Sequence, residues 1–145
     1  MDPKDEEPIA IVPNGHVRRL DGVRVLVVED SPDAREMMHE ILSFYGADCA
    51  SVGDVPSARE KLLELSPDVI LSDIGLPGED GYAFLRWLGG QPSPPRAPPV
   101  IALTAYDLKD WHAAGFETHL RKPVEIERLV EAILDALKKR KSEPQ

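Results

Sequence analysis

The fold is decided by residues 69–78, which read VILSDIGLPG. An apolar run from Val69 to Leu71 leads to Asp73, and a Leu-Pro-Gly turn follows. Short apolar runs rich in β-branched residues and bounded by turn signals are typical of buried strands. Asp73 is therefore predicted at the carboxyl end of a strand, where open α/β sheets bind their ligands. An aspartate there can also act only as a turn or helix cap, so the rest of the chain has to decide its role.

The composition predicts one globular domain. The 145 residues are 42% hydrophobic, and no apolar run approaches the about 18 residues of a membrane span, so no membrane segment is expected. The formal net charge of −9 argues against direct binding of nucleic acid, but it is compatible with a bound cation. The single cysteine, Cys49, fits a reducing cytoplasm and is expected to be a small buried residue.

Charge and proline content divide the chain into three parts. Residues 1–22 hold three prolines and many charges without any periodicity, and we expect them to form a flexible arm. Residues 23–140 are expected to form the folded domain, and residues 141–145 a C-terminal tail. No output domain could follow Lys141 in this sequence, which favours a domain that acts alone. Whether the chain is complete or a piece of a longer protein stays open.

Strand and helix patterns alternate five times along the domain. Runs of strand-forming residues predict five strands, at residues 23–28, 48–52, 69–73, 100–104 and 118–121. The first helix is predicted between a cap at Ser31 and Gly46. Its core stripe includes Met37 and Met38, and that of the last helix begins at Ile126. The alternation implies parallel βαβ units, and hence an α/β fold with a doubly wound parallel sheet and helices on both faces.

Four of the predicted strands end in polar residues of different chemistry, namely Glu29 with Asp30, Asp73, Thr104 and Lys122. In a parallel sheet these ends meet at one edge, so we expect the side chains to lie together. Three clustered carboxylates repel one another and favour a divalent cation, and a few hard oxygen ligands suit Mg²⁺. A metal, an ammonium and a hydroxyl together stabilise a transferring phosphoryl group, for which Asp73 is a candidate covalent acceptor.

These strand ends resemble the receiver domain of two-component response regulators. The matching motifs are Val28-Glu29-Asp30, Ser72-Asp73-Ile74-Gly75-Leu76-Pro77-Gly78 with Asp80-Gly81, Leu103-Thr104-Ala105 and Lys122-Pro123. The resemblance covers roughly residues 23–137. It implies a flavodoxin-like, five-stranded sheet in the order 2-1-3-4-5, with the site between the first and third strands. It also implies a cytoplasmic signalling module rather than an enzyme.

The same resemblance assigns the acceptor and the metal ligands. Asp73 is expected to be the phosphoacceptor. Glu29, Asp30, Asp73 and the backbone carbonyl of Gly75 are expected to bind Mg²⁺, with Asp30 a more direct ligand than Glu29. Gly75 also lies two residues after the acceptor, where the family tunes hydrolysis of the phosphoryl group. Its missing side chain predicts slow loss of that group.

The resemblance also assigns the residues that respond to phosphorylation. Thr104 is expected to contact the phosphoryl group and to move on activation, with Lys122 pairing with that group. Tyr106 is expected to shield it. His119 stands where the family usually has an aromatic switch residue, and it is either a half-buried strand histidine or an altered, pH-sensitive switch. The interval from Thr104 to Lys122 is about four residues short, one helical turn, which predicts a shortened fourth helix and a monomer or weak dimer.

The expected partners are a histidine kinase or phosphotransfer protein and a downstream protein target that the sequence does not identify. Direct binding to nucleic acid or to a membrane is not expected. A pseudo-receiver that binds partners without phosphorylation, and a receiver that is part of a larger protein, are the alternatives. A haloacid-dehalogenase-type phosphatase is disfavoured, because it needs Asp-x-Asp after the first strand and this chain has Asp30-Ser31-Pro32.

Overall fold

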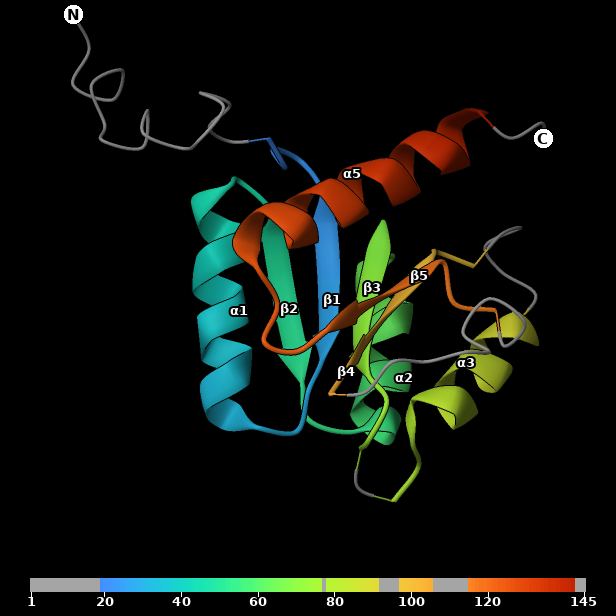
Figure 1. Ribbon diagram of the computed structural model, residues 1–145. Coiled ribbons are helices and arrows are strands. Elements are labelled where there is room, and N and C mark those ends of the chain that lie inside the picture. Colours follow the sequence, from blue (N-terminus) through green and yellow to red (C-terminus); the bar gives the residue numbers. More distant parts are fainter. Residues whose placement is uncertain (1–18, 77, 92–96, 106–114, 143–145) are drawn as a thin grey trace, which may run out of the picture.

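The computed structural model describes residues 19–76, 78–91, 97–105 and 115–142 (Figure 1). Five parallel strands form one sheet: β1 (Arg24–Val28), β2 (Asp48–Val52), β3 (Val69–Asp73), β4 (Val100–Thr104) and β5 (Thr118–Arg121). Their order across the sheet is β2-β1-β3-β4-β5. The doubly wound parallel sheet and its strand order are therefore confirmed.

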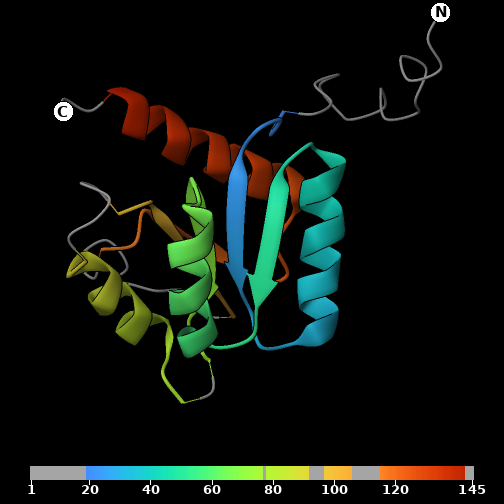
Figure 2. The ribbon, with the colours of Figure 1, turned by 180° about the vertical axis from the view of Figure 1, so that it is seen from behind.

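Helices cover both faces of this sheet, as expected. They are α1 (Pro32–Phe44), α2 (Val55–Leu65), α3 (Gly81–Gly89) and α5 (Ile126–Ser142). Figure 1 shows α1 and α5 on one face, and Figure 2, seen from behind, shows α2 and α3 on the other. The shortened fourth helix was expected between β4 and β5, where residues 106–114 lie outside the described residues. Among the described residues, no helix combines the length and apolar character that crossing a bilayer requires.

Three helices begin with a side-chain cap directly after a strand–helix loop. Ser31 accepts a hydrogen bond from the amide of Ala34 at the start of α1, at 3.3 Å. Asp54 caps α2 and Asp80 caps α3 in the same way, at 2.8 and 2.9 Å. An N-cap side chain satisfies one of the amides that the first helical turn leaves free. The caps therefore fix where each helix starts at the carboxyl edge of the sheet.

The core consists of two apolar clusters, one on each face of the sheet. Val25 and Val27 of β1 lie in the cluster with α1 and α5, whereas Leu26 and Val28 lie in the cluster with α2. This follows from the alternation of side chains along a strand. All four are essentially inaccessible to solvent, as expected for a central parallel strand.

Two core predictions were wrong. Met37 is 63% exposed and Ile126 is 45% exposed. Met37 is turned by about 100° from Met38 on the helix, so it lies beside the buried stripe of α1 rather than within it. Ile126 is the first residue of α5, and the first fully buried residue of this helix is Leu129.

The chain before β1 contributes to the core. Leu20 is fully buried in the cluster with α1 and α5, and its amide donates to the carbonyl of Tyr45 at 2.9 Å. Arg19 forms an ion pair with Glu127 of α5 at 3.2 Å. The last part of the arm expected over residues 1–22 is therefore packed on the domain, whereas residues 1–18 lie outside the described residues.

Candidate functional site

The strand register brings the predicted site residues to one edge. Val28 of β1 is level with Ser72 of β3, and Asp73 is level with Leu103 of β4. Thr104, the last residue of β4, is level with Arg121 of β5. The residues that follow or end these strands are Glu29, Asp30, Asp73, Thr104 and Lys122. They therefore lie at the carboxyl edge, where the arrows of β1 and β2 point in Figure 2.

Three carboxylates form the centre of this edge. Glu29, Asp30 and Asp73 each present an oxygen within 4.8 Å of the other two. Glu29 and Asp73 are buried, at 3% and 9% exposure, whereas Asp30 is exposed. Like charges this close disfavour one another unless a cation compensates them. The exposed Asp30 leaves the cluster open to solvent on one side.

Lys122 supplies part of that compensation. Its Nζ donates to Oε1 of Glu29 at 2.6 Å and to Oδ2 of Asp73 at 2.9 Å. Burial by itself would lower the pKa of Lys122, but hydrogen bonds to Glu29 and Asp73 and their negative charges outweigh it and raise the pKa. The ammonium therefore stays charged between the two buried carboxylates.

The turn after β1 is held by groups that the sequence pattern did not reveal. The amide of Ser31 donates to Oε2 of Glu29 at 3.0 Å. Nη1 of Arg35, on α1, donates to the carbonyl oxygens of Glu29 and Asp30 at 2.7 and 3.2 Å. A Cβ at Gly53 would lie 2.8 Å from that nitrogen, so a glycine leaves room for it. A single sequence gives no sign that an arginine in the first turn of a helix binds backbone carbonyls.

The loop after β3 closes against Asp73. The amide of Gly75 donates to Oδ1 of Asp73 at 3.1 Å, which orients that carboxylate. The amide of Gly81 donates to the carbonyl of Ile74 at 2.9 Å. A Cβ at Gly81 would lie 2.7 Å from the carbonyl oxygen of Asp73, so this close approach requires glycine.

The proposed switch residues are placed unevenly. Thr104 is 3% exposed at the end of β4, and its carbonyl accepts from the amide of Lys122 at 2.7 Å. His119 is half-buried on β5, level with Ala102 of β4. Tyr106 lies outside the described residues. A backbone hydrogen bond thus brings Thr104 next to Lys122. His119 lies within β5, three residues before Lys122 and beside Ala102 of β4.

The donor set fits Mg²⁺. Glu29, Asp30 and Asp73 offer carboxylate oxygens, the ligand type that Mg²⁺ prefers. The carboxylates of Glu29, Asp30 and Asp73 together with the Lys122 ammonium carry a formal charge of −2, which one divalent cation would neutralise. A site with this charge can bind a dication, and the dication can in turn accept the oxygens of a phosphoryl group.

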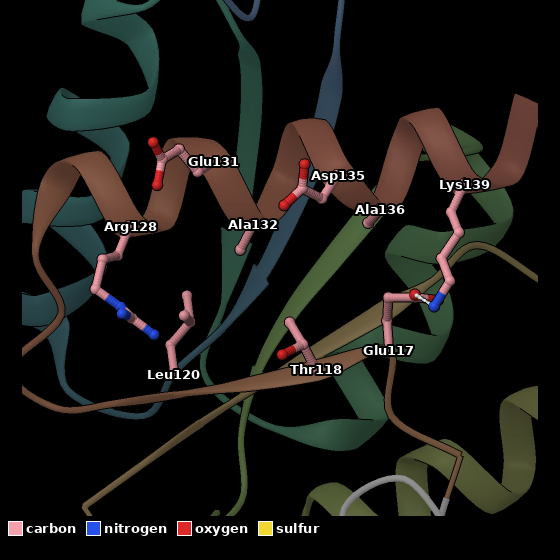
Figure 3. A pocket seen from close by; sticks show the side chains of 9 residues that line it. All are labelled: Glu117, Thr118, Leu120, Arg128, Glu131, Ala132, Asp135, Ala136 and Lys139. Atoms are coloured by element: carbon pink, nitrogen blue, oxygen red, sulfur yellow. Dashed lines mark ion pairs between the residues drawn. The ribbon is translucent and has the colours of Figure 1, made fainter.

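A separate groove of about 480 Å³ lies between β5 and α5. Figure 3 shows its lining of Glu117, Thr118 and Leu120 from β5 and its approach and Arg128, Glu131, Ala132, Asp135, Ala136 and Lys139 from α5. Lys139 and Glu117 form an ion pair across one end at 3.0 Å. None of the carboxylates at the strand ends contributes to it, so the groove is not part of the candidate site.

Comparison with known proteins identifies a family. Residues 25–134 match the response regulator receiver domain. The DNA-binding response regulator MtrA of Mycolicibacterium smegmatis is 32% identical over 125 residues, which are 83% of this chain and 53% of that protein. The chain therefore spans about half the length of such curated relatives.

Solved structures agree in fold. The signal receiver domain of a signal transduction histidine kinase from Syntrophus aciditrophicus has a TM-score of 0.74 and 31% identity, covering 86% of this chain and 96% of that one. The receiver domain of sensor histidine kinase PA1611 from Pseudomonas aeruginosa PAO1 has a TM-score of 0.73 and 30% identity, covering 81% and 98%. That second structure has a magnesium ion coordinated in its active site cleft.

Proposed function

The chain belongs to the response regulator receiver domain family of two-component systems, and we propose that Asp73 accepts a phosphoryl group in a Mg²⁺-dependent reaction. One observation carries the proposal: Lys122 bridges two buried carboxylates, Glu29 and Asp73, beside the exposed Asp30. A purely structural ion pair needs only one carboxylate. Burying a second carboxylate at the same point adds the free-energy cost of removing another charge from water. The surplus negative charge is explained if a cation binds there.

The proposed reaction is a direct transfer to a carboxylate. An oxygen of Asp73 attacks the phosphorus of a phosphohistidine, an O–P bond forms, and the N–P bond breaks. The imidazole leaves with the electron pair and takes up a proton. Asp73 is suited to this role because the Gly75 amide and the Lys122 ammonium hold its two oxygens in a fixed orientation.

The residues around Asp73 have complementary tasks. Glu29, Asp30, Asp73 and the carbonyl of Gly75 would hold Mg²⁺, which when bound neutralises charge on the phosphoryl oxygens. Arg35 fixes the turn that presents both Glu29 and Asp30. Such outer partners keep metal ligands in place.

Two further residues respond to the product in this proposal. The Lys122 ammonium forms an ion pair with the phosphoryl group, and its hydrogen bonds to Glu29 and Asp73 already hold it beside the acceptor. The hydroxyl of Thr104, buried at the next strand end, hydrogen-bonds the phosphoryl oxygens. His119 and Tyr106 are proposed to adjust the switch and the lifetime of the phosphoryl group.

Signalling is proposed to run through protein contacts in the cytoplasm. A histidine kinase or phosphotransfer protein donates the phosphoryl group, and a downstream protein recognises the phosphorylated domain, with the chain a monomer or weak dimer. No catalytic output beyond the phosphoryl transfer is proposed. The proposal applies equally to a receiver that stands alone and to one within a longer protein.

Incubation with acetyl phosphate and Mg²⁺ tests this function, read by intact mass. The expected result is one added phosphoryl group, which EDTA prevents. Asp30→Ala should weaken Mg²⁺ binding and slow the reaction, whereas Lys122→Ala should preserve metal binding better than activation. A folded, Mg²⁺-binding protein that neither acetyl phosphate nor histidine kinases modify would instead be a pseudo-receiver.

A further inference from the structure

The loop between β3 and α3, residues 74–80, carries Gly75 and contains two glycines. Among the described residues, and apart from the neighbours in the chain, no atom lies within 4 Å of where a Cβ would stand at Gly75 or at Gly78, and Gly78 has a φ of +77°. Glycines widen the range of backbone conformations open to a short loop. The hydrogen bond from the Gly81 amide to the Ile74 carbonyl closes the base of the loop.

An ion pair connects α2 to Glu79, near the end of this loop that leads into α3. The guanidinium of Arg59 pairs with the carboxylate of Glu79. Arg59 also lies over the ring of Trp87 on α3, with Cζ 5.5 Å from the ring centroid. Trp87 in turn stacks on Phe84, with centroids 6.1 Å apart, and Phe84 is fully buried.

Two contacts, with Glu79 and with the ring of Trp87, orient the guanidinium of Arg59. Its side chain is 29% exposed, and that of Glu79 is 40% exposed. Exposed ion pairs are generally weak, because two long side chains must be ordered to form them. Here the stacking on Trp87 already orders the guanidinium, and a planar guanidinium that is held in place loses less entropy for each hydrogen bond it forms.

We propose that Arg59 is a positioning residue for the metal and acceptor site. By holding Glu79 it restricts the loop that presents Gly75, and this proposal rests on the proposed function. A shift of the loop would move the Gly75 carbonyl, proposed as a ligand, and the Gly75 amide, which orients Asp73 at 3.1 Å. An ordered loop loses less freedom when the metal binds, so the affinity is higher.

The first measurement uses the metal-free protein. Amide hydrogen exchange at Gly75 and Gly81 reports how often the loop opens. In Arg59→Ala, both amides should exchange about three- to tenfold faster. Calorimetric titration with Mg²⁺ should show the affinity weakened by a similar factor, at or below the lower limit of the roughly 10–100-fold that groups orienting metal ligands contribute.

Matched variants separate this role from a general effect on α2. Lys61→Ala removes an exposed pair with Glu64 on the same helix, 3.7 Å apart, and should change neither measurement. Glu79→Gln should reproduce Arg59→Ala, and the double variant should be no worse than either alone, because both remove one interaction. Arg59→Lys should restore part of the affinity, since it keeps the charge but not the planar stacking.

The outcomes are distinguishable. The positioning role would be overturned if Arg59→Ala and Glu79→Gln showed the same amide exchange and the same Mg²⁺ affinity as the wild type. It would also be overturned if Lys61→Ala lost as much Mg²⁺ affinity as Arg59→Ala. If Arg59→Ala does not fold, the variant at the half-buried Glu79, Glu79→Gln, decides alone. A wild type that binds Mg²⁺ through this loop but is never phosphorylated would remove the proposed function and leave the positioning role intact.

Discussion

The Nζ atom of Lys122 lies 2.6 Å from Oε1 of Glu29, which precedes it by 93 residues in the chain. Glu29 is 3% exposed, so its charge is compensated mainly by this ammonium and by the amide of Ser31. The first and fifth strands are thereby joined at their carboxyl ends. Glu29 thus has two tasks in this account, as the partner of Lys122 in the metal-free protein and as part of the metal site.

Replacement of Lys122 by alanine is expected to destabilise the metal-free protein by about 2 kcal/mol. Removing one partner of a fully buried pair costs roughly 3–5 kcal/mol, and the effect is smaller here because the Lys122 side chain is 33% exposed. Saturating Mg²⁺ should recover part of the loss, because a ligand that binds only the folded state stabilises it. Urea unfolding with and without Mg²⁺ measures both effects.

Lys139→Ala is the matched control for that variant. It removes an ion pair of similar length with Glu117, but the Lys139 side chain is 64% exposed. Its effect should stay within about 1 kcal/mol. Equal losses in the two variants would show that the Lys122 pair is no more than a surface contact.

The raised pKa of Lys122 predicts a loss of its contribution in strong alkali. A lysine with a raised folded-state pKa binds its proton more tightly in the folded state, so folding is favoured while the lysine is charged. That contribution is complete below the ordinary pKa of 10.5 and is lost as the pH rises through the higher folded value. The difference in unfolding free energy between wild type and Lys122→Ala should therefore shrink above about pH 10.5. A difference that grows with pH would contradict the assignment.

The sequence predicted the sheet and the strand ends well because both follow from local pattern. Buried parallel strands read as apolar runs, and the residue type at each end is visible directly. The pattern could not say which of the adjacent Glu29 and Asp30 is buried, since that depends on where Lys122 arrives from the fifth strand. The contact of Arg59 with Glu79 was missed for a similar reason, because it joins residues that lie 20 positions apart in the chain. The contacts of Arg35 reach only five and six residues back, but an arginine on a helix gives no sequence signal that it binds backbone carbonyls.

The flexible arm was predicted to extend to residue 22, but its last residues are packed on the domain. Leu20 follows a polar, proline-rich stretch, and a single leucine gives no periodicity, yet it is fully buried. Leu20→Ala is therefore expected to destabilise the domain by about 2–5 kcal/mol, the usual range for a core leucine. Thermal or urea unfolding measures this loss. Leu63→Ala, at a leucine on α2 that is 75% exposed, is the control and should change the stability little.

Gly81 is predicted to tolerate no side chain. In Gly81→Ala the new Cβ would lie 2.7 Å from the backbone oxygen of Asp73, so the loop or β3 must shift. We expect a loss of about 1–3 kcal/mol in stability, as for other overpacked sites, together with slower phosphorylation. Gly89→Ala, at the end of the same helix, meets no atom of the described residues within 4 Å and should be neutral or slightly stabilising. Equal stability and phosphorylation rates in the two variants would contradict the close approach.

The most direct test of the central claim is to locate the phosphoryl group on the chain. Borohydride reduces an acyl phosphate on aspartate to homoserine and leaves free carboxylates unchanged, so peptide mass spectrometry then identifies the modified residue. After incubation with acetyl phosphate and Mg²⁺, the account predicts homoserine at position 73 alone, and none in Asp73→Asn or in EDTA. Homoserine at position 30, or none at position 73 in a folded protein that binds Mg²⁺, would contradict it.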